Sequence, residues 1–201
     1  KAHILRDLHH APQLLQVVNV WDVVSARAVA AVPGTTALAT AGHSIAATFG
    51  YDDGTIPFDL TLDLLGRITA AVDLPVTADL DDGYDEPGET TRRVIGAGIV
   101  GANVEDRLRP LAESVSRVEA IIAAGAAEGV DFVLNARTDA FVRGGDRPAA
   151  ESIADAVERG RAYLAAGATT VFVPGNFGED VVTELVAGLG EGKLSLIGFP
   201  S

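Results

Sequence analysis

Short runs of consecutive apolar residues alternate along the chain with longer segments in which apolar residues recur every three or four positions. Short runs of this kind are typical of strands buried on both faces, and the longer segments are typical of amphipathic helices. The pattern predicts seven strands, over residues 14–20, 35–40, 74–79, 99–104, 132–136, 169–173 and 194–197. It predicts helices over residues 23–32, 59–72, 89–97, 111–128, 149–166 and 179–187, an amphipathic segment over 5–15 that is broken at Pro12, and a loop over 41–53 that contains one helical turn.

Regular alternation of strands and helices indicates a parallel sheet covered by helices. Seven such units fit a (β/α)8 TIM-type barrel whose eighth unit is missing from the chain better than they fit an open sheet of five or six strands. An open, doubly wound sheet is the alternative. No Gly-x-Gly-x-x-Gly or Walker-type loop follows the first strand, which counts against a nucleotide-binding version of that sheet. We expect the 201 residues to form a single barrel domain.

Composition narrows the classes of partner. The net charge of −13 disfavours nucleic acid and anionic membrane surfaces, although a local arginine or metal can still attract an anionic substrate. The chain has no cysteine, which excludes disulfides, thiolate catalysis and cysteine-ligated zinc. With no recognisable signal peptide and no apolar run near 18 residues, the expected location is the cytoplasm, without membrane association.

The third predicted strand leads directly into the carboxylates Asp79, Asp81 and Asp82. Residues two apart in an extended chain point to the same side, so Asp79 and Asp81 can converge. Like charges converge only around a cation or a shared proton. Mg²⁺ is the natural candidate because it prefers oxygen ligands and often keeps several waters around one or two carboxylates. A solvated acidic turn is the alternative.

Other predicted strands also end in residues that can carry chemistry, and active sites of parallel barrels form at those strand ends. Asp22, after the first strand, is well explained as a helix N-cap. Glu105, after the fourth strand, is not, and it extends the predicted metal site. Arg137, after the fifth strand, is suited to clamp a substrate carboxylate or phosphonate. A structural ion pair of Arg137 with Glu105 or Asp106 is the alternative.

Three segments together resemble the phosphoenolpyruvate mutase/isocitrate lyase superfamily. They are Val-Thr-Ala-Asp-Leu-Asp-Asp-Gly-Tyr at 76–84, Gly-Ala-Asn-Val-Glu-Asp at 101–106 and Asn-Ala-Arg-Thr-Asp-Ala at 135–140. Gly-Tyr-Asp-Asp-Gly at 50–54 and Val-Phe-Val-Pro-Gly at 171–175 add to the match. The resemblance implies a (β/α)8 barrel, Mg²⁺ with Mn²⁺ as an alternative, a homo-oligomer that is a dimer or more often a tetramer, and a small anionic carboxylate substrate that passes through a pyruvate enolate.

The resemblance also implies roles for individual residues. Asp79 would bind the metal directly, Asp53, Asp81 and Glu105 would hold metal-bound waters, and the backbone at Gly42 would cradle the enolate. The candidate site divides into metal, substrate-binding and catalytic groups. The metal-binding group is Asp79, Asp81 and Glu105. The substrate-binding group is Trp21, Ala41, Gly42, Asn135 and Arg137. The catalytic group is Arg137, Asp53 and His43.

The chain departs from the superfamily pattern in its loops. The absence of a cysteine-bearing loop makes isocitrate or methylisocitrate cleavage by the cysteine mechanism unexpected. The segment 107–110, Arg-Leu-Arg-Pro, is short and lacks the lysine of the mutase gating loop. A serine usual in the anion-cradling loop is Ala41 here, and His43 replaces an apolar residue, as a proton donor or as a polar wall. We hypothesise that N-terminal residues, a gating loop and the C-terminal unit lie outside this sequence.

The leading hypothesis is a Mg²⁺-dependent lyase or decarboxylase that acts on a small 2-oxo or 2-hydroxy acid at the carbon beta to the ketone. One alternative is carbon–phosphorus chemistry of the phosphonopyruvate mutase or hydrolase type. The other is a catalytically idle barrel that binds a metal and a dicarboxylate. Ala41 motivates the idle barrel, whereas the retained carboxylates and Arg137 argue against it.

Overall fold

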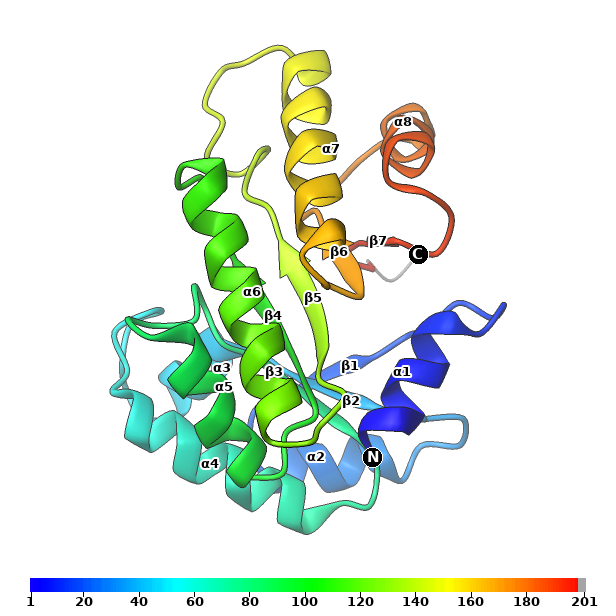
Figure 1. The fold of residues 1–201 in the computed structure, drawn as a ribbon. Coiled ribbons are helices and arrows are strands. Elements are labelled where there is room, and N and C mark those ends of the chain that lie inside the picture. The colour runs from blue at the N-terminus through cyan, green and yellow to red at the C-terminus, as the bar shows by residue number, and fades with distance from the viewer. Residues whose placement is uncertain (199–201) are drawn as a thin grey trace.

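A computed structural model of the chain describes residues 1–198. Strands and helices alternate in it along the whole of that range (Figure 1). The strands are β1 (Val18–Val20), β2 (Leu38–Thr40), β3 (Val76–Asp79), β4 (Gly101–Glu105), β5 (Val133–Arg137), β6 (Thr170–Phe172) and β7 (Leu194–Ser195). The helices are α1 (Ala2–His10), α2 (Val23–Ala30), α3 (Gly42–Thr48), α4 (Phe58–Ala71), α5 (Pro87–Gly96), α6 (Leu111–Ala127), α7 (Ala149–Ala165) and α8 (Glu179–Leu189).

The seven strands form one parallel sheet in the order β1-β2-β3-β4-β5-β6-β7. The sheet curls into a half-barrel with helices packed along its outside (Figure 1). A doubly wound sheet would reverse its strand order at a switch point, so that alternative is wrong. The predicted barrel architecture is confirmed as seven successive units, and β1 and β7 are the two edges of the sheet within residues 1–198.

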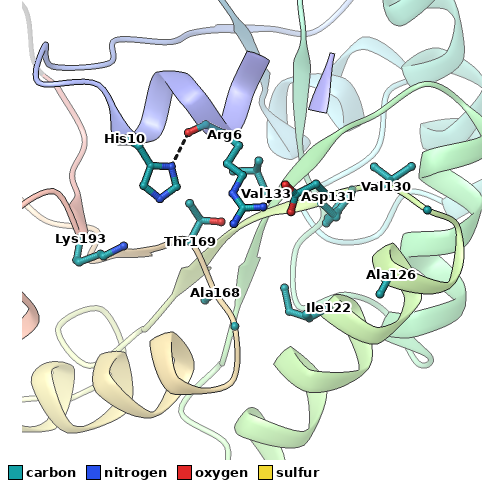
Figure 2. Close-up of a pocket in the computed structure, with 13 residues that line it drawn as sticks. Arg6, His10, Ile122, Ala126, Val130, Asp131, Val133, Ala168, Thr169 and Lys193 are labelled. Atoms are coloured by element: carbon teal, nitrogen blue, oxygen red, sulfur yellow. Dashed lines mark hydrogen bonds and ion pairs between the residues drawn. The ribbon is translucent and has the colours of Figure 1, made fainter. Parts of the chain in front are cut away.

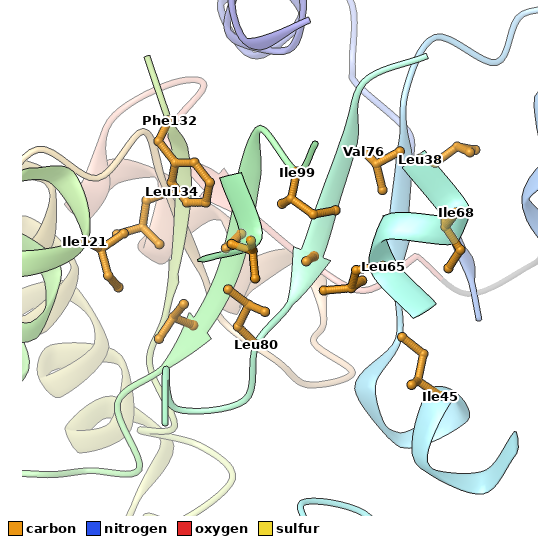
Figure 3. Close-up of a cluster of buried hydrophobic side chains, with 14 of the residues drawn as sticks. Leu38, Ile45, Leu65, Ile68, Val76, Leu80, Ile99, Ile121, Phe132 and Leu134 are labelled. Atoms are coloured by element: carbon orange, nitrogen blue, oxygen red, sulfur yellow. The ribbon is translucent and has the colours of Figure 1, made fainter. Parts of the chain in front are cut away.

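The main core lies between the convex face of the sheet and the helices. Figure 3 shows its side chains between β2–β5 and the surrounding helices, and the fully buried members include Leu38, Leu65, Ile68, Val76 and Leu134. On β3 to β5 the last residues alternate between buried and half-buried side chains. Because successive side chains of a strand point to opposite faces, the apolar residues enter this core and the polar ones face the concave side.

The polar residues of the concave side form two layers across the sheet. The register pairs Asp79 with Asn103 and Asn103 with Asn135, and one layer further on it pairs Glu105 with Arg137. Paired residues of parallel strands point to the same face, so each layer brings polar side chains from different strands together. The sheet therefore gathers the candidate residues of three strands at its C-terminal edge.

The predicted strands at both edges are wrong in length. The strand predicted over 14–20 pairs only over Val18–Val20, and the side chain of Leu14 is 84% exposed. Within the described part of the chain, β1 pairs only with β2, which begins at Leu38, so the residues before Val18 have no strand there to bond. The strand predicted over 194–197 likewise pairs only as far as Ser195. The helical turn predicted within 41–53 is a full short helix, α3. Among the described residues, no helix has the length and apolarity needed to cross a bilayer.

Candidate active site

The first part of the site is the carboxylate of Asp79, the last residue of β3. The backbone N–H of Asp79 donates to Thr40 Oγ1 on β2 (3.1 Å), and Asp79 Oδ2 accepts from the backbone N–H of Gly42 (2.9 Å). A Cβ atom at Gly42 would lie 3.2 Å from Asp79 Oδ2 and 3.4 Å from Asp81 Oδ1. The glycine thus allows both carboxylates to approach the start of α3. The amide predicted to cradle a substrate contacts a carboxylate here.

Asp81 stands beside Asp79 in a constrained conformation. Its φ of +50° lies in the left-handed region, and its backbone carbonyl accepts from the Glu105 N–H (2.7 Å). Burial raises the pKa of Asp81 to about 6, with further contributions from the negative charges of Asp79, Asp53 and Glu105. The predicted convergence of these carboxylates is therefore present, and ionised Asp81 is destabilised by its neighbours.

Glu105, the last residue of β4, is surrounded by guanidinium groups. Arg137 Nη1 lies 3.0 Å from Glu105 Oε2, and Arg107 Nε donates to Glu105 Oε1 (3.1 Å). Burial raises the pKa of Glu105, and the charge of Arg137 opposes that rise. The ion pair considered as an alternative for Arg137 is thus formed with Glu105, and Glu105 connects the acidic part of the site to a basic part.

Two buried aspartates after β4 and β5 position these arginines. Asp139, which is fully buried, accepts from Arg137 Nε and from Arg143 Nε, each at 2.8 Å. Asp106 accepts from the backbone N–H of Asp139 (3.0 Å) and from the Tyr163 hydroxyl (2.7 Å). Asp106 therefore supports the turn that carries Asp139, and within residues 1–198 its ion pair is with Arg159 (3.3 Å) and not with Arg137.

Three residues of this site were not predicted from the sequence. They are Thr40, Arg143, and Asp139 in its role of anchoring the arginines. For Arg143 a signal was available, because an acid followed four residues later by an arginine can pair across one helical turn, as Asp139 and Arg143 do. No comparable signal marks Thr40, whose role depends on the pairing of β2 with β3.

The other predicted residues lie at different distances from the carboxylates. Trp21 follows β1 and is exposed, beside Asp22, which caps α2 by accepting from the Ser25 N–H (2.6 Å), as predicted. Ala41 is buried immediately before α3, and His43 is exposed in its first turn, with Nε2 3.0 Å from Ser44 Oγ.

Asp53 and Asn135 have contrasting surroundings. Asp53 is exposed in the loop after α3 but lies close enough to Asp81 to raise its pKa. Asn135 lies in the middle of β5, where its Oδ1 accepts from Thr170 Oγ1 (2.8 Å) and its Nδ2 donates to Ser195 Oγ (3.2 Å). Asn135 thus links β5 to β6 and β7, and its predicted contact with a substrate stays a prediction.

The oxygen atoms around Asp79 meet the requirements of a hydrated divalent cation. Residues 1–198 contain no group of three or more His, Cys, Asp or Glu side chains placed so that they could hold one metal ion. They do provide two converging carboxylates, Asp79 and Asp81, and the register places Asn103 next to Asp79, with its buried Oδ1 lacking a hydrogen-bond partner. An oxygen-only set of one or two carboxylates fits Mg²⁺, which keeps most of its waters. The residues present therefore fit a hydrated hard cation.

A cavity of about 460 Å³ lies at the opposite end of the strands (Figure 2). Arg6 and His10 of α1 and Lys193 border it, beside Thr169 at the start of β6, and Arg6 pairs with Asp131. These residues precede the strands, whereas Asp79 and Arg137 end them. Reactions in barrels of this architecture take place at the C-terminal ends of the strands, so the carboxylate–arginine cluster is the better candidate site.

Comparisons with known proteins agree with this geometry. Residues 5–199 match the family model of phosphoenolpyruvate phosphomutase. A crystal structure of a phosphonomutase-like protein of Burkholderia cenocepacia superimposes with a TM-score of 0.90 at 40% identity, covering 98% of this chain and 83% of that one. Oxaloacetate acetylhydrolase in complex with oxalate superimposes with a TM-score of 0.84 at 27% identity, covering 97% and 70%. The 2-methylisocitrate lyase of Escherichia coli is 32% identical over 169 residues.

The matched chains are longer than this one. The aligned region covers 76% of this chain and 53% of the Escherichia coli lyase. For an uncharacterised Mycobacterium tuberculosis relative that is 31% identical, the values are 89% and 68%. This chain thus spans about half to two thirds of the length of these curated relatives.

Proposed function

Since the chain belongs to the phosphoenolpyruvate mutase/isocitrate lyase superfamily of lyases and mutases, we propose that it is a Mg²⁺-dependent lyase or decarboxylase. Its substrate is a small 2-oxo or 2-hydroxy acid, and the bond broken is at the carbon beta to the ketone. The name of one structural relative, an oxaloacetate acetylhydrolase that binds oxalate, supports a planar 2-oxo acid as the reacting unit.

The observation that carries the proposal is the division of one strand-end cluster into two halves of opposite charge. Asp79 and Asp81 form the acidic half, and Arg137 lies in the basic half beyond Glu105. A 2-oxo acid with a second anionic group has matching parts, because its oxygen atoms suit a cation held by carboxylates and its far end suits a guanidinium.

The proposed reaction follows from a substrate whose ketone lies at the acidic half and whose far end lies at the basic half. In an oxaloacetate-like substrate, cleavage between C3 and C4 releases carbon dioxide, and the electron pair of that bond moves toward the ketone, giving the enolate of pyruvate. The enolate then takes up a proton at C3 and becomes pyruvate. A divalent cation held by Asp79 and Asp81 would supply Lewis-acid stabilisation of the negative charge that develops at the ketone oxygen.

The protein's own groups orient the substrate and supply the proton. Arg137 is held by Glu105 and Asp139 (3.0 and 2.8 Å), so its guanidinium is fixed before a substrate arrives. His43, exposed in the first turn of α3 next to Gly42, is the proposed proton donor. Asp53, which influences the charge of Asp81 from the loop after α3, is proposed to hold a metal-bound water.

Carbon–phosphorus chemistry is the second candidate. It is favoured by the 40% identity to the phosphonomutase-like protein and by the 32% identity to the phosphoenolpyruvate phosphomutase of Streptomyces hygroscopicus. A guanidinium binds a phosphonate as well as a carboxylate, so Arg137 alone does not separate the two reactions.

A panel of substrates distinguishes 2-oxo acid cleavage from carbon–phosphorus chemistry. Purified protein with Mg²⁺ is assayed for pyruvate release from 2-oxo and 2-hydroxy dicarboxylates, and for conversion of phosphonopyruvate by ³¹P NMR. We expect pyruvate release that EDTA abolishes and that Asp79→Ala removes without unfolding the protein. Asp63→Asn is the matched control, because Asp63 is an exposed acid on α4. Turnover of phosphonopyruvate alone would establish the second candidate, and a folded protein inactive on every substrate would leave the idle barrel.

We also propose that the chain forms one barrel domain and assembles into a homo-oligomer, a dimer or a tetramer. Apolar side chains are exposed on α2 and just after it, at Val24 (76%) and Val32 (56%). Exposed apolar side chains on one face favour association with further protein surface. Light scattering coupled to size-exclusion chromatography tests this, and a monomer at micromolar concentration would contradict it.

A further inference from the structure

A cluster of three guanidinium groups surrounds Glu105 at the strand ends. Arg137 Nη1 is 3.0 Å from its carboxylate, Arg107 Nε is 3.1 Å away, and Arg143 Nη2 is 3.9 Å away. The three arginines come from three different positions: the turn after β4, the end of β5 and the segment that follows β5. We call Arg107, Arg137 and Arg143 the arginine cluster.

The cluster presents positive charge outward and keeps its counter-charges inside. The side chains of Arg107 and Arg143 are 39% and 49% exposed, whereas that of Glu105 is 12% exposed and that of Asp139 is 0% exposed. An incoming ligand would therefore meet N–H donors before carboxylates. Asp82, whose side chain is 13% exposed, lies 3.4 Å from Arg107 Nε and is a third internal counter-charge, so the cluster is locally balanced in charge while its N–H donors face outward.

The anchoring of Arg107 and Arg143 leaves their outer nitrogens for a ligand. Each donates a hydrogen bond through Nε, Arg107 to Glu105 and Arg143 to Asp139, and no side-chain hydrogen bond of their Nη atoms is found within residues 1–198. A guanidinium held through Nε can still bind a carboxylate or phosphonate with its two Nη groups. Arg137 uses both Nε and Nη1 on acids, so it has fewer donors to offer.

The backbone at Arg107 is held in an unusual shape. Arg107 and Leu108 both have positive φ, at +49° and +53°. Buried Asp106 supports this turn, since its Oδ1 accepts from the Leu108 N–H (2.9 Å) and its carbonyl accepts from the Arg109 N–H (3.0 Å). Non-glycine residues persist in this region where the surroundings fix them, often at ligand clamps. Here the shape brings Arg107 over Glu105.

We propose that Arg107 and Arg143 are specificity-determining residues that bind a terminal anionic group of the substrate, beyond the reacting 2-oxo unit. The substrate class is then a 2-oxo acid that carries a second, distal carboxylate or phosphonate, and 2-oxo acids with an apolar end are poor substrates. This inference rests on the proposed function, because it assumes that the 2-oxo unit lies at Asp79 and Asp81.

Two ligands of different reach test the inference by calorimetric titration in the presence of Mg²⁺. Oxalate mimics the reacting end alone, and 3,3-difluorooxaloacetate adds a distal carboxylate. Loss of one charge-assisted contact weakens binding by roughly tenfold or more. We therefore expect Arg107→Gln and Arg143→Gln each to raise the Kd of difluorooxaloacetate about 10-fold or more, while the Kd of oxalate changes less than about threefold because only the general field is altered.

Control variants test whether a loss of affinity comes from a change in the fold and not from the loss of a contact with the ligand. Arg67→Gln removes an exposed arginine on α4 and should leave both affinities unchanged. Arg107→Lys should recover part of the lost affinity by restoring charge without the planar fork. Arg107→Gly removes the side chain but favours the left-handed backbone, so it should fold at least as well as Arg107→Gln and bind difluorooxaloacetate as weakly.

The outcomes are distinguishable. Equal weakening of oxalate and difluorooxaloacetate in the arginine variants would overturn the inference, since the cluster would then act only through its general field. If the arginine variants bound both difluorooxaloacetate and oxalate as well as the parent protein does, the inference would also be overturned. The proposed function would then remain in place. If the parent protein bound neither ligand with Mg²⁺ present, the proposed function would fail and the inference would fail with it.

Discussion

Replacing Asp81 with asparagine should stabilise the protein at neutral pH when no divalent cation is available. Burial and the neighbouring acids, Asp79 foremost, raise the pKa of Asp81 from 3.8 to about 6. Its side chain accepts no hydrogen bond from the described residues, and its structural hydrogen bond to Glu105 is made by the backbone carbonyl. Asp81→Asn therefore removes an unfavourable charge, keeps the shape and breaks no described contact.

The sign of the pH effect follows from proton linkage. Because its pKa is higher in the folded than in the unfolded state, Asp81 binds its proton more tightly when folded, and stability is lost as the pH rises from about 4 through about 6. The rise of the pKa of Asp81 from 3.8 to about 6 corresponds to about 3 kcal/mol. Asp81 is partly exposed, so solvent screening reduces the cost to about 1–2 kcal/mol.

Urea denaturation in EDTA at pH 4.5 and at pH 7.5 measures this difference. We expect Asp81→Asn to exceed the parent by about 1–2 kcal/mol at pH 7.5 and by about a third of that at pH 4.5, where Asp81 is largely protonated in the folded state but already largely ionised in the unfolded state. Mg²⁺ at 100 times its Kd should raise the stability of the parent by about 2.7 kcal/mol and that of the variant by less. A variant that is no more stable than the parent at pH 7.5 in EDTA would refute this account of the carboxylates.

Three further substitutions test the fold by thermal or urea denaturation. Gly101→Ala places a Cβ 2.7 Å from the Val133 carbonyl oxygen in the middle of the sheet and should cost about 1–3 kcal/mol, whereas unchanged stability would show that β4 and β5 can separate. Tyr163→Phe removes the 2.7 Å hydrogen bond to buried Asp106 and should cost about 1–3 kcal/mol, and a neutral result would mean that water replaces the hydroxyl. Asp22→Ala removes the N-cap of α2 and should cost about 0.5–2 kcal/mol, with Asp22→Asn as the control that retains a capping oxygen.

The sequence predicted the order of elements and the strand-end positions of the chemistry well. Asp79, Glu105 and Arg137 are the last residues of their strands, each within one residue of the predicted end. These strands are central in the sheet, so each pairs with a strand on either side. Their predicted apolar runs therefore agree closely with the residues that are paired in the structure. At the edge, Leu14 is as apolar as a core residue but is exposed, because local apolarity does not reveal whether a neighbouring strand exists.

The basic half of the site was predicted only in part. Arg137 was found from its position after a strand, but its contact with Glu105 depends on the register of β4 against β5. Arg143 lies beyond the strand, and its orientation depends on Asp139, which is buried. The spacing of Asp139 and Arg143 permits their pairing, but the burial of Asp139 and the contact of Arg137 with Glu105 arise from tertiary packing, which spacing along one chain does not encode.

The alternation of side chains on β3 to β5 has a consequence for how such an enzyme can diversify. Val76 and Ala78 are buried against the helices, while Asp79 faces the concave side. Substitutions at the concave positions can therefore change substrate preference with little effect on the packing beneath them. A one-residue insertion within a strand would instead exchange the two sets, directing carboxylates into the helical layer. New activities in this architecture should thus arise by point substitution and by loop length changes, and insertions should be confined to the segments between strands.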